Sequence, residues 1–147
     1  MTPPHRSTYM PALLAVALLG MVAAFLAPHD KYFLGNLAWY WLPSAAVVVL
    51  LALSGAKAVA TVGCAVALTV SLISYRAWVA SLPRPEGMAW LFFWLALPGS
   101  FLGAYLANAF AVRRSLRMAP AALLAGATAA LGFMLNMALA FCILSLA

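Results

Sequence analysis

The sequence predicts an all-α fold: a polytopic membrane helix bundle of five transmembrane helices, with the N-terminus inside and the C-terminus outside. The first observation is composition, because 68% of the 147 residues are hydrophobic, 7% are charged and the mean hydropathy is +1.09. A soluble domain of this length cannot bury so much apolar surface. The second is a series of apolar runs long enough to cross a bilayer, and the third is an uneven distribution of basic residues around them.

Short connections separate the predicted spans, which favours antiparallel neighbours within a single integral membrane domain, residues 1–147. No internal repeat, low-complexity tract or long linker divides the sequence. The first span also resembles a cleavable signal peptide, but Pro28 directly follows the candidate cut at Ala27, which favours a retained helix. The five spans cover residues 10–27, 37–54, 58–79, 88–112 and 119–146.

The fourth span, residues 88–112, indicates the orientation most clearly. Aromatic residues that include Trp90 and Trp94 open it, and a cluster of arginines follows it. Tryptophan prefers the headgroup region and arginine is retained on the cytoplasmic side, so this span is expected to enter from outside. The basic residues expected inside are Arg6, Lys57, Arg113, Arg114 and Arg117, and those expected outside are Lys31, Arg76 and Arg84. We expect a multi-pass protein of the cell inner (plasma) membrane, with an organelle membrane as the alternative.

Small residues in the fourth and fifth spans mark faces for close helix packing. Gly99 and Gly103 form a GxxxG pair, and Ala107 continues the same face one turn later. Gly132 and Asn136 lie on a comparable face of the fifth span, where a carboxamide in hydrocarbon needs a hydrogen-bond partner. Two readings stay open: these faces pack against each other within the chain, or they form an interface with a partner.

The predicted external rim gathers all five tryptophans and both acidic residues of the chain. The ordinary interpretation is an interfacial aromatic belt with solvated loop charges. The functional interpretation is a recognition surface in which Arg76 pairs with an acid instead of reaching for the headgroups. The candidate recognition residues are His29, Asp30, Arg76, Arg84, Glu86, Trp90 and Trp94.

Catalytic and cofactor chemistry has little support in the sequence. His5 and His29 are expected on opposite sides of the membrane, so they cannot share a metal or a haem within one chain. No predicted span contains an acid, a histidine or a lysine, which disfavours proton or cation transport. The net charge of +6 follows from the positive-inside bias and does not indicate nucleic acid. We therefore expect no catalytic residues, no metal and no cofactor.

These observations favour a non-enzymatic membrane protein that binds another protein within the membrane. It would be an accessory subunit of a membrane complex, or an immunity-type neutraliser of a membrane-acting partner. Besides the lipid bilayer, its expected partner is another membrane protein or a second copy of the chain. One alternative is a small oligomeric channel or transporter assembled across the Gly99 and Gly103 face. A second is an enzyme that acts on lipid-linked substrates at the external face through His29, Asp30, Arg84 and Glu86.

Overall fold

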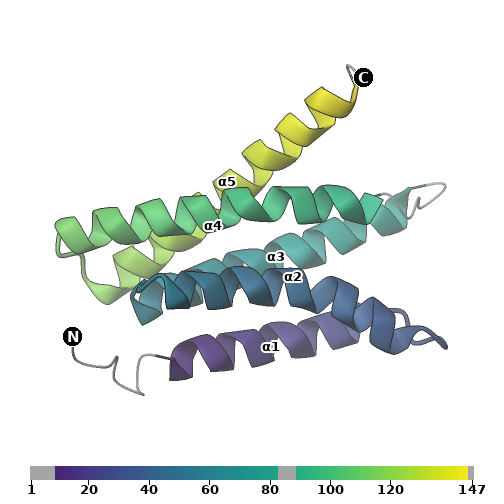
Figure 1. Ribbon diagram of the computed structural model, residues 1–147, viewed down its shortest axis with the longest axis horizontal. Coiled ribbons are helices and arrows are strands. Elements are labelled where there is room, and N and C mark those ends of the chain that lie inside the picture. Colours follow the sequence, from purple (N-terminus) through teal and green to yellow (C-terminus); the bar gives the residue numbers. More distant parts are fainter. Residues whose placement is uncertain (1–8, 83–88, 146–147) are drawn as a thin grey trace.

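The computed structural model describes residues 9–82 and 89–145, and in these residues it contains five helices and no strand (Figure 1). Four of the helices, α2 to α5, are long and apolar enough to cross a membrane, whereas α1 is shorter at 17 residues. The predicted all-helical fold is therefore confirmed for the described residues, and several helices suit a multi-pass membrane protein. The helices are α1 (Met10–Leu26), α2 (Phe33–Leu53), α3 (Ala58–Ser81), α4 (Ala89–Arg113) and α5 (Met118–Ser145).

The start of α2 differs most from the prediction, because the helix begins at Phe33 and not at residue 37. Asp30 explains the earlier start. Its carboxylate oxygen accepts hydrogen bonds from the Tyr32 backbone N–H at 2.8 Å and from the Asn36 side chain at 3.3 Å. Its carbonyl accepts the Phe33 N–H at 3.0 Å. These bonds close an Asx turn directly before α2, whose N-cap residue Tyr32 makes no side-chain cap hydrogen bond.

Two tight turns with the same hydrogen-bond pattern join α2 to α3 and α4 to α5. The N–H of Gly55 bonds to the carbonyl three residues earlier, the N–H of Ala56 bonds to the carbonyl five residues earlier, and Ser115 and Leu116 repeat both bonds. This is the Schellman helix ending, which needs a residue with positive φ. Gly55 has φ +80° and Ser115 has φ +49°. Both turns lie at one end of the bundle (Figure 1), which we call the basic end, and the opposite end is the aromatic end.

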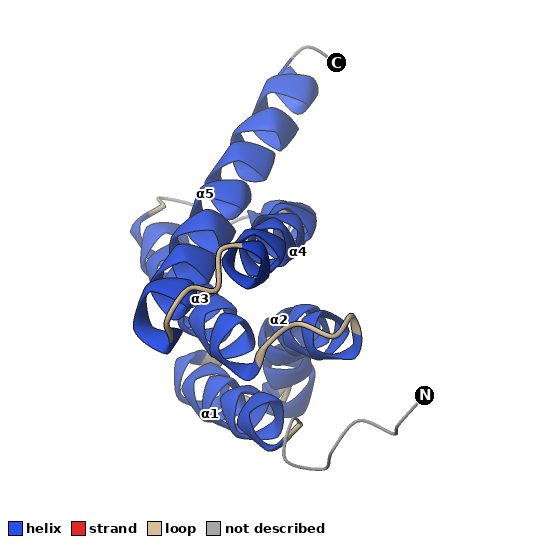
Figure 2. Cartoon of the chain, turned by 90° about the vertical axis from the view of Figure 1, so that its left-hand side faces the viewer, coloured by secondary structure: helices blue, strands red, loops and turns tan. Residues whose placement is uncertain are grey.

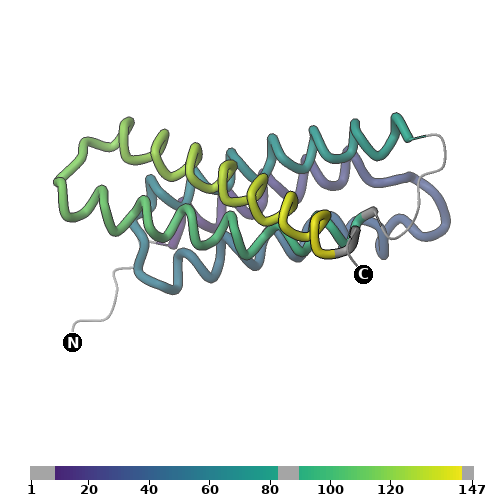
Figure 3. Tube along the Cα trace, turned by 90° about the horizontal axis from the view of Figure 1, so that it is seen from above, coloured from purple at the N-terminus to yellow at the C-terminus, as the bar shows by residue number. Residues whose placement is uncertain are grey.

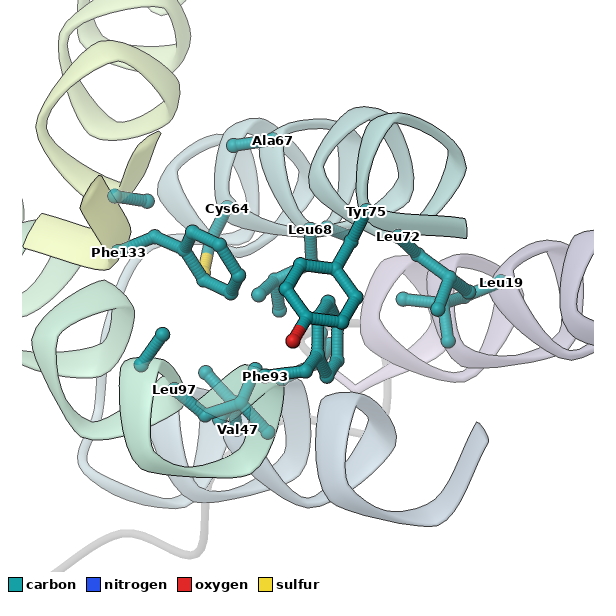
Figure 4. Packing of buried hydrophobic residues seen from close by; sticks show 14 of the residues in the cluster. Leu19, Val47, Cys64, Ala67, Leu68, Leu72, Tyr75, Phe93, Leu97 and Phe133 are labelled. Atoms are coloured by element: carbon teal, nitrogen blue, oxygen red, sulfur yellow. The ribbon is translucent and has the colours of Figure 1, made fainter. Parts of the chain in front are cut away.

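An aromatic cluster joins four helices in the core toward the aromatic end. Tyr40 of α2 packs on Trp90 of α4 with ring centroids 4.1 Å apart, and Tyr75 of α3 lies 5.3 Å from Phe93 of α4. Phe93 in turn lies 5.2 Å from Phe133 of α5. Figure 4 shows Tyr75, Phe93 and Phe133 converging from three different helices. Because aromatic rings bury large apolar areas, this cluster is a major contact among α2, α3, α4 and α5.

A tryptophan side chain attaches α1 to the rest of the bundle. The indole N–H of Trp41 in α2 donates a hydrogen bond to the backbone carbonyl of Val16 at 3.1 Å. The ring lies against Gly20, where a Cβ would come within 3.1 Å of the indole nitrogen. The absence of a side chain at Gly20 therefore lets the indole reach the backbone of α1. End-on, α1 packs beside α2 and α3 on the side of the bundle away from α5 (Figure 2).

Candidate functional site: the two sides of α5

One side of α5 packs against α4 through backbone atoms. A Cβ at Gly99 would overlap the Gly132 carbonyl oxygen, and a Cβ at Gly103 would overlap the Thr128 carbonyl oxygen. We call the contact formed by Gly99, Gly103, Thr128 and Gly132 the seam. Figure 3 shows α5 crossing over α4 along its length. In a membrane, this close approach gains dispersion contacts between the backbones, which larger residues would prevent.

Asn136 extends the seam by one turn toward the aromatic end. Its amide nitrogen donates a hydrogen bond to the backbone carbonyl of Leu95 in α4 at 2.6 Å. Pro98 lies inside α4 and lacks an N–H, so the helix already misses one backbone bond in this turn. The carboxamide of Asn136 therefore has a hydrogen-bond partner within the chain, as a polar side chain in an apolar helix requires.

Ala107 continues the seam toward the basic end. It is buried and packs in a cluster with Ala60 of α3 and Ala125 of α5. Three alanines from three helices meet there, which only small side chains allow. The residues proposed for helix packing or for a partner interface therefore all lie where α4 and α5 meet within the chain.

The other side of α5 faces α3 and is held at two points. At the basic end, Gly63 packs against the backbone of α5, and a Cβ at Gly126 would lie 3.0 Å from the Gly63 carbonyl oxygen. At the aromatic end, the rings of Trp78 and Phe141 meet edge to face with centroids 6.2 Å apart. Between these contacts the two helices are separated by an apolar groove.

This α3–α5 groove has a volume of about 860 Å³. Its floor includes Ala67, Tyr75 and Phe133, which are buried. Its walls include Val66 at 59% exposure and Met134 at 65% exposure, so the groove opens to the outside of the bundle. A pocket of this size and apolar lining suits an elongated hydrocarbon ligand. Its wall residues are Val62, Val66 and Val70 of α3 and Leu123, Met134 and Met137 of α5.

Two candidates for external recognition have local structural roles. Asp30 forms the turn before α2, as described above, and among the described residues it makes no ion pair with Arg76. His29 stacks on Phe33 with ring centroids 4.9 Å apart.

Arg76 lies close enough to Tyr40 to interact with it electrostatically. Arg84 and Glu86 lie outside the described residues, so the expected pairing of Arg76 with Glu86 stays a prediction.

The candidate tryptophans are built into helix contacts. Trp90 is only 9% exposed and belongs to the aromatic cluster, so it does not offer a surface for recognition. Trp94 packs on Trp39 of α2 with ring centroids 4.2 Å apart, and its indole N–H is buried without a hydrogen-bond partner in the described chain. Trp39 and Trp78 are the more exposed tryptophans, at 45% and 40%. Among the described candidates, Trp90 and Trp94 are therefore part of the packing between helices.

The basic end carries a concentration of exposed positive charge. Lys57 precedes α3, Arg113 ends α4, and Arg114 and Arg117 lie in the turn between α4 and α5. Asp30, the acid that the structure describes, lies at the opposite end of the bundle. Asn108 joins α4 to the turn before α3, because its side-chain oxygen accepts the Lys57 backbone N–H at 3.0 Å. This end is therefore electrostatically suited to anionic groups.

Reasoning from the sequence missed the groove and the aromatic cluster. Val62, Val66 and Val70 recur at four-residue spacing on one face of α3, which was a signal for the groove wall. Nothing in that spacing indicated that α5 would stand away from this face over part of its length. The aromatic cluster had no comparable signal, because tryptophan and tyrosine near a span end also fit an interfacial belt.

No protein-family model, curated protein or solved structure matches this chain. Its function is therefore inferred from its own geometry. The described residues contain no group of three His, Cys, Asp or Glu side chains that would hold a metal ion. Its most distinctive surfaces are the two sides of α5 and the basic end.

Proposed function

We propose that the protein is a multi-pass protein of the cell inner membrane that acts by binding another membrane protein. In this proposal all five helices cross the bilayer, with the N-terminus inside and the C-terminus outside. The basic end would face the cytoplasm, because positively charged turns are retained there. The protein would serve as an accessory subunit of a membrane complex, or as a neutraliser of a membrane-acting partner.

The observation that carries this proposal is the unpartnered face of α5. Leu131, Leu135 and Leu139 follow one another at four-residue spacing and are exposed by 56%, 63% and 56%. We call these residues the outer stripe. The end of α5 rises away from the other helices (Figures 1 and 2), and Phe141, near this end, contacts Phe92 of α4 and Trp78 of α3. A projecting helix gains packing contacts when a second transmembrane helix lies along it, and lipid chains replace those contacts only in part.

The contacts made by particular residues favour a binding function over a channel or an enzyme. A pore assembled across Gly99 and Gly103 would require α5 to leave the seam. The Asn136 amide that would line such a pore is bonded to α4. At the proposed external face, the Asp30 carboxylate is bonded within the turn before α2 and His29 stacks on an aromatic ring, so neither is poised as an acid or base in the described chain.

The test is site-specific photocrosslinking in native membranes. A photoreactive residue replaces Leu135 on the outer stripe, and a matched control replaces Leu14 on α1, which is similarly exposed at 59%. We expect a discrete crosslinked species of fixed mass for position 135 and none for position 14. Lipid adducts alone at both positions would contradict the proposal. A species of twice the mass of the chain would identify the partner as a second copy.

A further inference from the structure

We propose that the α3–α5 groove holds a hydrocarbon chain of an anionic phospholipid whose headgroup lies between Lys57 and Arg117. This site uses the face of α5 that lies toward α3, whereas the proposed protein partner uses the outer stripe. The two proposals are therefore independent. The lipid belongs to the leaflet at the basic end of the bundle.

The length of the groove fits a lipid chain better than a helix. From Gly63 to Trp78 the axial rise along α3 is about 22 Å, at 1.5 Å per residue. The hydrocarbon of one leaflet is about 15 Å deep, whereas a crossing helix needs about 30 Å and is about 10–12 Å wide. The Trp78 and Phe141 rings close the aromatic end of the groove to such a helix. A hydrocarbon chain can end below this contact.

The lining of the groove favours a flexible apolar ligand. Met134 and Met137 line the α5 side, and methionine side chains adapt to ligands of irregular shape. Val66 and Val70 line the α3 side. The groove opens laterally past these exposed walls, so a lipid enters it from the bilayer and needs no path from water.

Charge at the basic end selects the headgroup. Lys57 and Arg117 directly precede α3 and α5, the two helices that form the groove, and both are exposed. The described acid, Asp30, lies at the far end of the molecule and does not neutralise them. Each cation near a membrane surface attracts anionic lipid appreciably. Two cations in the turns that lead into the groove-forming helices therefore favour an anionic headgroup over a neutral one.

The depth of the two charges matches the depth of a headgroup. Lys57 lies five residues before Val62, where the groove begins, which is about 7.5 Å along the helix axis. The interfacial region on each side of a bilayer is about 5–7 Å thick. When Val62 lies at the edge of the hydrocarbon, the ammonium of Lys57 is therefore at phosphate level.

Native mass spectrometry of the full chain tests the proposal, with dioleoyl phosphatidylglycerol and dioleoyl phosphatidylcholine added in competition after delipidation. We expect one phosphatidylglycerol to be retained in preference. Filling the groove from either wall, by Val70→Trp or by Ala130→Phe, should weaken retention about ten-fold or more, as for loss of a buried apolar contact. Leu135→Trp on the outer stripe is the matched control and should retain the lipid. Two groove variants are used so that a folding defect in one leaves the other informative.

Charge variants test the headgroup separately. Lys57→Gln combined with Arg117→Gln should reduce the preference for phosphatidylglycerol about ten-fold, while a lipid is still bound. Arg113→Gln combined with Arg114→Gln removes the same charge from residues that do not directly precede α3 or α5 and should preserve most of the preference. Equal loss in both pairs would overturn the assigned headgroup position. Unchanged retention in both groove-filling variants, or a dimer that these variants abolish, would overturn the lipid as the occupant.

Discussion

The two sides of α5 differ in how closely a neighbouring helix approaches. Toward α4, Gly99 and Gly103 meet the backbone of α5 directly, and no larger residue would fit. Toward α3, one similar contact at Gly63 is followed by a groove of about 860 Å³ that extends up to the Trp78 ring. This difference shows that one helix can pack closely against one neighbouring helix through small residues, and can leave a groove beside another through large flexible residues. Fixed contact supports the fold, and the space is available to a ligand.

The largest expected effect comes from adding a methyl group within the seam. A Cβ at Gly132 would lie 2.7 Å from the carbonyl carbon of Gly99, and rigid backbone cannot yield as a side chain can. Gly132→Ala should lower the free energy of unfolding by about 2–3 kcal/mol, the cost of overpacking. Thermal unfolding in mild detergent measures this effect.

Gly35→Ala in α2 is the matched control, because nothing lies within 4 Å of a Cβ at Gly35. Its stability should be unchanged, or raised by up to about 1 kcal/mol through the better helix propensity of alanine. Equal stability of Gly132→Ala and the wild-type chain would show that α4 and α5 are not in backbone contact.

The turn between the two seam helices offers a way to strengthen the seam. Ser115 has φ +49°, a conformation that costs an L-residue about 1–2 kcal/mol and costs glycine much less. Ser115→Gly should therefore raise the free energy of unfolding by about 1 kcal/mol, after the greater freedom of glycine in the unfolded chain is allowed for. Chemical denaturation in mixed micelles provides the measurement.

The equivalent turn before α3 provides the reciprocal variant. Gly55 has φ +80°, so Gly55→Ser should lower the free energy of unfolding by about 1 kcal/mol. Opposite signs for the two variants are expected, and the same sign for both would contradict the shared turn geometry.

A smaller effect is expected from the hydrogen bond at the edge of the seam. Asn136→Leu removes the donor to the Leu95 carbonyl, and such bonds in membranes contribute about 0.6 kcal/mol on average. The loss of stability should fall near this value and below that of Gly132→Ala. Amide hydrogen exchange should also rise in the α4 turn around Leu95. A loss above that of Gly132→Ala would mean that the hydrogen bond, and not backbone packing, holds α5 to α4.

The smallest effect is expected in the groove wall. Met134 is 65% exposed, so Met134→Ala should change stability by no more than about 0.5 kcal/mol. A methionine in a closed helix contact would cost about 2–5 kcal/mol when truncated. A measured loss in that higher range, by unfolding in delipidated micelles, would show that α3 and α5 close over this position.

The helices and the faces with small residues follow from sequence patterns, but their partners do not. Helical spacing placed Gly99, Gly103 and Ala107 on one face, yet the same spacing suits any neighbouring helix. The early start of α2 follows a turn closed by the Asp30 side chain, which the hydrophobic pattern alone does not reveal. Trp90 was expected at an interface because its ring is amphipathic, and it is buried because Tyr40 packs on it from α2.

The groove was harder to predict from the sequence than any of the helices. It depends on the divergence of α3 and α5 between Gly63 and Trp78, and divergence is a property of two helices and not of either sequence. The candidate charges in residues 83–88 lie outside the described residues, so their predicted role is not addressed. Local patterns therefore identify faces, whereas the site arises from how those faces are paired.

Disulfide formation between introduced cysteines in native membranes tests the difference between the two sides of α5 most directly. In a background with Cys64→Ala and Cys142→Ala, one pair joins the seam side, Ala107→Cys with Ala125→Cys, which are buried in one cluster. The other pair spans the groove, Val70→Cys with Met134→Cys. Mild oxidation should join the first pair readily, whereas the second should need a longer bifunctional thiol reagent. Equally rapid disulfide formation by the groove pair would contradict the open side of α5.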